Sequence, residues 1–266
     1  MLLFIGFMSI SAPCSPFPTE LSEAGLDGEI IFVDDNSRDG SVEVVDDLIS
    51  RNYNVRIIVR TEERGLSSAV LRGFRDASHD VVLVMDADLQ HDPKYIPALL
   101  APIINDKSDF SVGSRHVGGG GIEGWSWHRR FISWGATLVA KPLIPCSDPM
   151  SGFFAMRKQT VQRAPVLNPL GYKIGLELMV RCNVTRITEV PIVFKDRTMG
   201  ESKLDFRTNL QYLMHVARLY WDCRPKVVLA AVMLVMMVAL IILKALNQQT
   251  LQKEASVAVQ GLNKKS

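Results

Sequence analysis

The stretch VVLVMDADLQHD at residues 81–92 constrains the fold more than any other part of the chain. Val81–Met85 is uniformly apolar, which is typical of a strand buried on both faces of a sheet. Asp86 and Asp88 follow directly, at the carboxyl end of this strand, where open α/β sheets bind their ligands. Carboxylates at this spacing are suited to hold one hard divalent cation that bridges to nucleotide phosphates. Because so short a motif is also common as an acidic exit from a strand, its surroundings decide between the two interpretations.

Two strand–loop–helix units precede this strand. The first joins Ile30–Val33 to a helix at 41–50 through DDNSRDGS, and the second joins Val55–Val59 to a helix that begins after Gly65. The alternation predicts an α/β fold with a parallel sheet and right-handed crossovers. Asp35 is placed either to accept a hydrogen bond from a base or ribose hydroxyl, or to cap the next helix. No GxGxxG or GxxxxGK[ST] motif follows these strands, so neither a Rossmann dinucleotide site nor a P-loop is predicted.

A glycine run at 118–121 introduces a segment that combines aromatic and basic side chains. It contains two tryptophans and two arginines, namely Trp125, Trp127, Arg129 and Arg130. An apolar helical stretch follows at 131–140. This combination favours a lid near a lipid surface that also clamps a phosphate. The alternative is a tryptophan packed in the core beside solvated arginines.

Two features bear on other ligands. The net charge of +2, from 30 basic and 28 acidic residues, gives no general attraction for nucleic acid, so any anion site is local. The loop RTMGESKL, from Arg197 to Leu204, carries Arg197 and Lys203 and is suited to close over a diphosphate, although an exposed polar loop explains it equally well.

The four cysteines lack paired or metal-binding spacing and are predicted to be reduced, as in the cytosol.

The C-terminal part of the chain is predicted to associate with a membrane. Val227–Leu243 contains seventeen residues without a charge, and with its flanks the segment 226–246 is long enough to cross a bilayer. A buried core helix is the alternative. The aromatic-rich segment 210–225 before it is predicted to lie along the interface, and 247–266 is a polar tail.

Six segments in this order carry a family resemblance: VDDNSRDGS, RGLSSAVLRGF, MDADLQHDP, GSRHVGGG, SDPMSGFF and RTMGESKL. They resemble the family 2 glycosyltransferases of GT-A fold, over roughly residues 20–221. The resemblance implies an α/β GT-A domain at 19–209 with a mainly parallel central sheet, followed by one C-terminal transmembrane helix. Within the family, the motifs are most similar to those of members that act on polyprenyl phosphates.

The activity that this resemblance implies is transfer of mannose from GDP-mannose to dolichol phosphate, with inversion at the anomeric carbon and with Mg²⁺ or Mn²⁺ as cofactor. The product would be the lipid-linked mannose donor for N-glycosylation, O-mannosylation and GPI-anchor synthesis. The implied setting is the endoplasmic reticulum membrane, with the catalytic domain facing the cytosol. A homo-oligomer is left open. Two alternatives remain: a UDP-glucose polyprenyl-phosphate glucosyltransferase, and a non-catalytic membrane-anchored homologue.

The resemblance also implies roles for individual residues. Val33 and Asp35 would contact the nucleoside. The ribose, metal and diphosphate would be contacted by Asp86, Ala87 and Asp88. Gln90 would join Asp86 and Asp88 at the metal. The donor would be held by Arg115, Arg197 and Lys203, and the acceptor phosphate would be received by Arg129 and Ser133. The groups expected to take part in catalysis are Asp88, Arg115, Arg129 and Ser133.

The N-terminus departs from the family pattern. The family opens with a strand and a Pro-x-Tyr-Asn-Glu loop that touches the nucleotide, and this sequence has no such loop before Glu29. Residues 1–18 are therefore expected to form an atypical segment in place of the first strand and much of the first helix. A sheet without that strand would expose a backbone edge and half of a binding wall. Reduced stability and weak or absent activity are predicted.

Overall fold

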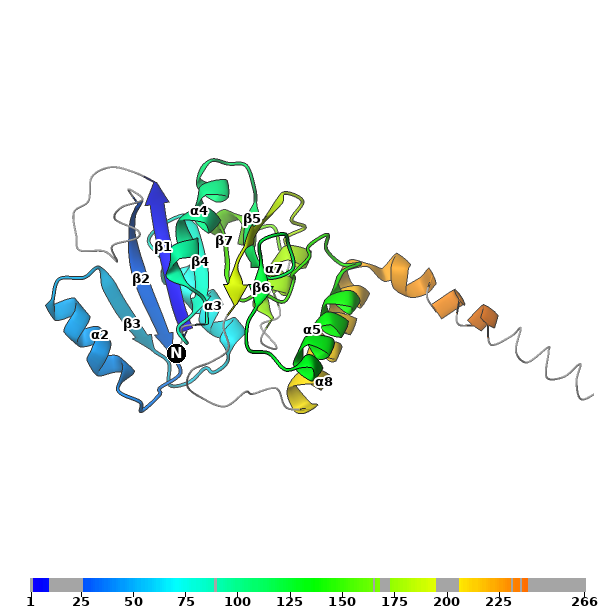
Figure 1. The fold of residues 1–266 in the computed structure, drawn as a ribbon, viewed down its shortest axis with the longest axis horizontal. Helices are drawn as coiled ribbons and strands as arrows, with labels where there is room; N and C mark the ends of the chain where they lie inside the picture. The colour runs from blue at the N-terminus through cyan, green and yellow to red at the C-terminus, as the bar shows by residue number, and fades with distance from the viewer. Residues whose placement is uncertain are drawn as a thin grey trace, which may run out of the picture. The chain divides into compact units, whose positions relative to one another are not determined.

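A computed structural model gives the fold (Figure 1) and describes residues 2–9, 26–88, 90–164, 166–167, 173–194, 206–230, 232–234 and 236–238. The chain divides into two compact units, Met1–Leu219 and Tyr220–Ser266. The first unit contains the sheet and the site described below.

A seven-stranded sheet organises the first unit, in the order β3-β2-β1-β4-β7-β5-β8. Its strands are β1 (Leu2–Ser9), β2 (Leu26–Asp34), β3 (Val55–Val59), β4 (Val81–Asp86), β5 (Phe110–Ser114), β7 (Phe154–Arg157) and β8 (Ile187–Pro191). Five strands share one direction, whereas β1 and β7 run against them. Four of the six neighbouring pairs are therefore antiparallel, so the predicted mainly parallel sheet is in fact a mixed one. A second sheet pairs β6 (Gly121–Ile122) with β9 (Val193–Phe194).

The N-terminal strand corrects one expectation. β1 lies between β2 and β4 and pairs with both in antiparallel register, Leu2 facing Val33 on one side and Asp86 on the other. The expected exposed backbone edge is therefore absent at this position, because the main chain of residues 2–9 fills it. The sequence predicted that this segment would replace a strand, but an apolar run does not specify its direction.

Strand β4 has the double-sided burial that its apolar run predicts, since Val81–Met85 is entirely buried. Its alternate side chains enter two different layers. Leu83 and Met85 join the core cluster with Leu99 and Ile103, on helix α4 (Ile96–Ile104). The opposite face, with Val84 and Asp86, lines a pocket with residues of α3 (Leu66–Asp76) and α7 (Ile174–Arg181). Asp86 thus leaves the strand on the side where α3 and α7 lie.

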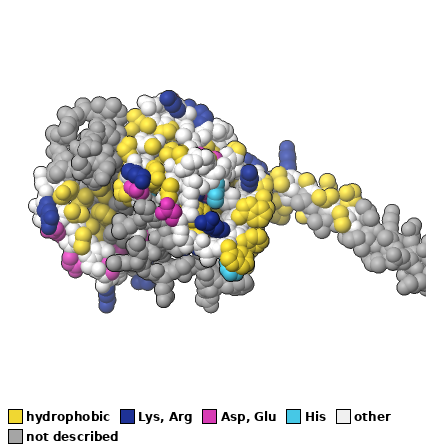
Figure 2. Space-filling model, viewed as in Figure 1, with side chains coloured by type: hydrophobic (Ala, Val, Ile, Leu, Met, Phe, Trp, Pro, Cys, Tyr) yellow, Lys and Arg dark blue, Asp and Glu magenta, His cyan; other side chains and the backbone are white. Residues whose placement is uncertain are grey.

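The remaining helices complete the first unit. They are α2 (Ser41–Ser50), the short 3-10 helix η1 (Pro93–Tyr95), α5 (Trp127–Ala140), α6 (Lys158–Val161) and the part of α8 (Phe206–Cys223) up to Leu219. Helices α5 and α8 lie side by side (Figure 1), and the Tyr212 hydroxyl of α8 donates a hydrogen bond of 2.6 Å to the Ala136 carbonyl of α5. Hydrophobic side chains gather over α5 in Figure 2; the exposed ones include Trp127, Phe131 and Trp134.

The predicted membrane span at 226–246 is only partly described. Residues 225–230, 232–234 and 236–238 are helical, and the rest of the span, like the tail at 247–266, lies outside the described residues. Among the residues that the structure describes, no helix combines the length and the apolar character needed to cross a bilayer.

Candidate active site

The candidate site lies along one edge of the sheet. β2, β3, β4 and β5 share a direction, so their carboxyl ends meet at that edge. Each strand ends at a charged side chain. These are Asp34 and Asp35 after β2, Arg60 after β3, Asp86 on β4 and Arg115 after β5.

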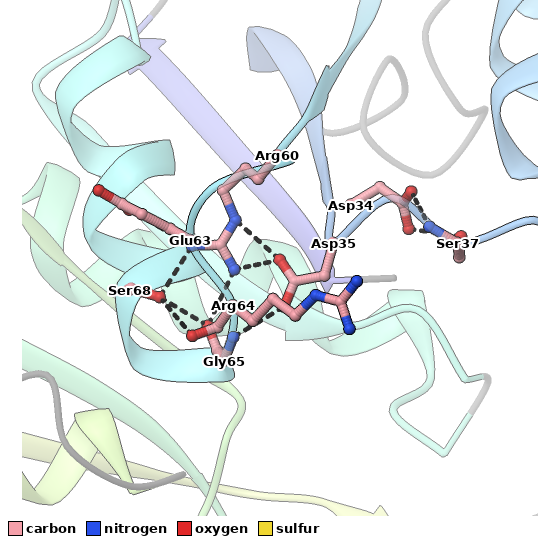
Figure 3. A network of polar contacts seen from close by, with 8 residues as sticks. All are labelled: Asp34, Asp35, Ser37, Arg60, Glu63, Arg64, Gly65 and Ser68. Carbon is pink, nitrogen blue, oxygen red and sulfur yellow. Dashed lines mark hydrogen bonds and ion pairs between the residues drawn. The ribbon is translucent and has the colours of Figure 1, made fainter.

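Asp35 belongs to a network that joins β2 to the start of α3 (Figure 3). The Arg60 Nε donates to Asp35 Oδ1 at 2.8 Å, and the Arg60 Nη2 donates to the same oxygen. The Gly65 backbone N–H donates to Asp35 Oδ2 at 2.7 Å, and Arg60 also donates to the Ser68 hydroxyl. A carboxylate accepts about four hydrogen bonds, so Asp35 retains capacity for a ligand hydroxyl or base N–H. Arg60 fixes its direction.

The carboxylates of the DDNSRDGS loop have separate tasks. Asp35 bonds to Arg60 and Gly65 and does not cap the next helix. Asp34 accepts hydrogen bonds from the Ser37 backbone N–H and hydroxyl, and its side chain points away from that of Asp35 (Figure 3). Asp39 accepts from the Ser41 hydroxyl and backbone N–H at the start of α2, and these bonds lower its pKa. Asp34 and Asp39 thus build the turn, and Asp35 is directed elsewhere.

Asp86 borders a small pocket between β4, the turn at 150–152 and the amino end of α7. Gly152 closes on it so tightly that a Cβ there would lie 3.3 Å from Asp86 Oδ2. Lys173 also lines the pocket and donates a hydrogen bond of 2.9 Å to the Met150 carbonyl. Burial and the Arg115 charge lower the pKa of Lys173 to about 8, whereas Asp86 and Asp148 act in the opposite direction. Asp86 and Lys173 therefore line the same pocket.

The three residues assigned to the metal lie at the last position of β4, for Asp86, and in the bends that follow it, for Asp88 and Gln90. Asp88 Oδ1 accepts a hydrogen bond of 3.2 Å from the Gln90 backbone N–H, and Gln90 is buried. Within the described part of the chain, no group of three or more His, Cys, Asp or Glu side chains is arranged to hold a metal ion. Two carboxylates and one amide suit an ion that takes its other ligands from phosphate and water.

Arg115 forms a buried ion pair that the sequence analysis missed. Its Nε and Nη2 donate to the two carboxylate oxygens of Asp148 at 2.6 and 2.7 Å, and its backbone N–H donates to Asp148 at 3.0 Å. Burial raises the pKa of Asp148, but the bonds from Arg115 outweigh it and the pKa is lowered. The SDPM turn was a signal for a polar anchor, because Asp-Pro turns bond their own backbone, but nothing in it specified Arg115 as the partner.

An aromatic cluster surrounds Arg115. Its guanidinium carbon lies 5.3 Å from the ring centres of Trp125 and of Phe194, and the guanidinium carbon of Arg129 lies 4.1 Å from the Trp125 ring. Ser133 follows Arg129 by one turn of α5, and both are half-buried on the inner side of that helix. The structure thus brings Arg115 and Arg129 to one aromatic ring. The ring packs directly against arginines, which differs from the alternative of a core tryptophan beside solvated arginines, and the predicted lid stays a prediction.

Of the other predicted site residues, the structure describes two and leaves two outside the described part of the chain. Val33 is buried in β2, and Ala87 is half-buried between the two aspartates. The predicted donor-binding residues Arg197 and Lys203 lie outside the described residues. Their roles remain predictions.

The edge of carboxylates and arginines on this sheet belongs to a sugar-transferring enzyme. The family model described as Glycosyl transferase family 2 matches residues 20–164, more than half of the chain, and the chain belongs to that family. Among solved structures, it is similar to glucosyl-3-phosphoglycerate synthase from Mycobacterium tuberculosis in complex with Mn²⁺, UDP and glucosyl-3-phosphoglycerate. The TM-score is 0.52 at 19% identity, over 74% of this chain and 70% of that one. The fold is therefore the GT-A glycosyltransferase fold.

Three curated relatives carry the name dolichol-phosphate mannosyltransferase. The protein from Mycosarcoma maydis is 50% identical over 210 residues, which are 77% of this chain and 71% of the relative. The Saccharomyces cerevisiae protein is 48% identical over 200 residues, 72% of this chain and 74% of the relative. The Pyrococcus furiosus protein is 48% identical over 203 residues, 74% of this chain and only 57% of the relative's length.

Proposed function

We propose that this chain transfers mannose from GDP-mannose to dolichol phosphate. The observation that carries the proposal is the shared edge of the sheet, where Asp35, Asp86 and Arg115 stand at the carboxyl ends of the parallel strands β2, β4 and β5. The identity of about half over at least 200 residues to proteins named for this activity supports it. Mannose rather than glucose follows from those names, so the UDP-glucose alternative is not favoured.

A divalent cation, Mg²⁺ or Mn²⁺, fits the donor set at the end of β4. The side chains of Asp86, Asp88 and Gln90 would hold it, since hard cations prefer carboxylate and amide oxygens. When bound, the ion would neutralise charge on the diphosphate as its bond to the sugar breaks. Asp35, oriented by Arg60, would accept hydrogen bonds from the nucleoside.

The chemistry needs charge and alignment more than it needs a base. An oxygen of the acceptor phosphate forms a bond to the anomeric carbon while the bond from that carbon to the diphosphate breaks and GDP leaves, with inversion. The acceptor is already an anion, so no side chain has to remove a proton. Arg129, with Ser133 one turn further along α5, would hold the phosphate in line, and Arg115 would stabilise the charge that develops.

The proposal includes attachment to the endoplasmic reticulum membrane, with the domain facing the cytosol. Helix α5 exposes Trp127, Phe131 and Trp134, and the neighbouring α8 exposes Leu213 and Met214. Apolar surface of this kind on paired helices suits the interfacial layer of a bilayer, close to a lipid-borne acceptor. The uncharged run Val227–Leu243 supports an additional membrane span.

Mannose transfer tests the proposal directly. The purified chain in detergent with dolichol phosphate, Mn²⁺ and radiolabelled GDP-mannose is expected to form labelled lipid above the level given by Asp88→Ala. Turnover is expected to be weak, because the family's Pro-x-Tyr-Asn-Glu loop is missing from the sequence. In parallel, GDP with Mn²⁺ should raise the melting temperature more than UDP does. Labelled lipid at the Asp88→Ala level, together with no preference for GDP, would refute the function.

A further inference from the structure

The indole of Trp125 lies between two cationic side chains of the proposed active site. The guanidinium carbons of Arg129 and Arg115 are 4.1 and 5.3 Å from its ring centre. Phe194 packs against the same ring edge-on, with 5.7 Å between ring centres. The Trp125 Nε1 is buried and has no hydrogen-bond partner within the described residues. An aromatic ring that serves only to fill the core has no need of two charged neighbours.

The two arginines are held in different ways. Arg115 donates to both oxygens of Asp148, so a carboxylate balances its charge and takes two of its donors. Arg129 is stacked on Trp125. Stacking on an uncharged ring orients a guanidinium without neutralising it, and it uses the flat face rather than the N–H groups in the plane.

We propose that Trp125 is a positioning residue that orients Arg129 for the acceptor phosphate. The inference rests on the proposed function and adds a residue to it. Trp125 acts through Arg129 more than through Arg115, because two hydrogen bonds to Asp148 already hold Arg115 and the indole lies closer to Arg129. Removing the ring is expected to weaken acceptor binding and to leave nucleotide binding unchanged.

A double-mutant cycle on acceptor binding tests this role without requiring turnover. The affinity of citronellyl phosphate, a short soluble prenyl phosphate, is measured by ³¹P NMR with GDP and Mn²⁺ present. We expect Trp125→Leu to weaken binding about tenfold, the size of one desolvated cation–π contact. In the Arg129→Ala background, Trp125→Leu should cause no further loss. Trp125→Phe, which retains a ring, should stay within about threefold of the unmodified chain.

GDP affinity serves as the folding control and should change less than about twofold in each variant. If Trp125→Leu loses GDP binding, Trp125→Met replaces it in the cycle, because a flexible apolar chain fills the same space. Equal losses in the presence and absence of Arg129, or no loss at all, would overturn the role of Trp125 and leave the proposed function standing. Absence of citronellyl phosphate binding by the unmodified chain would overturn both.

Discussion

Each end of the active-site edge contains an ion pair between an arginine and an aspartate. The more buried partner is the arginine at one end and the aspartate at the other. At the nucleoside end, the Arg60 side chain is 2% exposed and its partner Asp35 is 35% exposed. At the other end, Asp148 is fully buried, and Arg115 keeps 8% of its side chain exposed. In each pair the buried member orients the more exposed one. Under the proposed function, a carboxylate is thereby presented to the nucleoside and a guanidinium to phosphate.

The largest effect is expected from Asp148→Asn. The substitution leaves Arg115 buried without a counter-charge, and breaking a buried pair in this way costs about 3–5 kcal/mol. The matched change at the other end, Asp35→Asn, removes a partly exposed carboxylate and leaves the Glu63 carboxylate 3.8 Å from Arg60. It should therefore lower the free energy of unfolding by only about 1 kcal/mol. Urea denaturation of the two variants measures the difference. Equal losses of stability would contradict the expected difference between the two ion pairs.

Arg115→Lys tests the second of the two ion pairs, between Arg115 and Asp148. Lysine retains the charge opposite Asp148 but lacks the planar fork that bonds both carboxylate oxygens, so the fold should survive while the charge is misplaced. We expect mannose transfer to fall about a hundredfold, the loss typical of one preorganised contact to the transition state. Transfer within threefold of the unmodified chain, with unchanged protein stability, would argue that Arg115 has only a structural role.

Asp35→Asn tests the nucleoside side through binding. Loss of one charge-assisted hydrogen bond is expected to weaken GDP about tenfold in isothermal titration calorimetry. Asp39→Asn is the matched control, because Asp39 is an exposed carboxylate of the same loop that bonds only within the turn. Its GDP affinity should not change. Similar losses in both variants would indicate that the turn as a whole matters, and not the direction of Asp35.

The last prediction concerns Lys173, which lines the pocket beside Asp86. Its folded-state pKa of about 8 is below its usual value of 10.5, so between these pH values the unfolded chain binds the extra proton. This residue's contribution to stability therefore rises as the pH increases from 8 to 10.5. Relative to Lys173→Met, the metal-free chain should gain about 2–3 kcal/mol across that window in urea denaturation. A constant difference would contradict the lowered pKa.

The sequence predicted the part of the fold that periodicity encodes. The buried strand at 81–85, the helix at 41–50 and the placement of Asp35 and Asp86 at strand ends all follow from local pattern, and the structure confirms them. The direction of β1 does not follow, because alternation and apolar runs are the same in either direction. Direction is decided by the long-range pairing of residues 2–9 with β2 and β4.

Only part of the candidate site could be predicted, because long-range pairing also decides which of its side chains contact one another. Many residues inside motifs were found, whereas the ion pairs of Asp148 with Arg115 and of Arg60 with Asp35 join partners that are distant in sequence. Arg60 carried a usable signal, since it follows a predicted strand just as Asp35 does. The pairing of Asp148 with Arg115 spans 33 positions, and no local rule specifies a contact of that length.

The reversed direction of β1 also affects how the protein is handled in the laboratory. Leu2 lies opposite Val33 and Asp86, so anything fused ahead of it leaves the sheet beside the carboxyl ends of β2 and β4. An affinity tag at that end would crowd the aspartates at the ends of these strands.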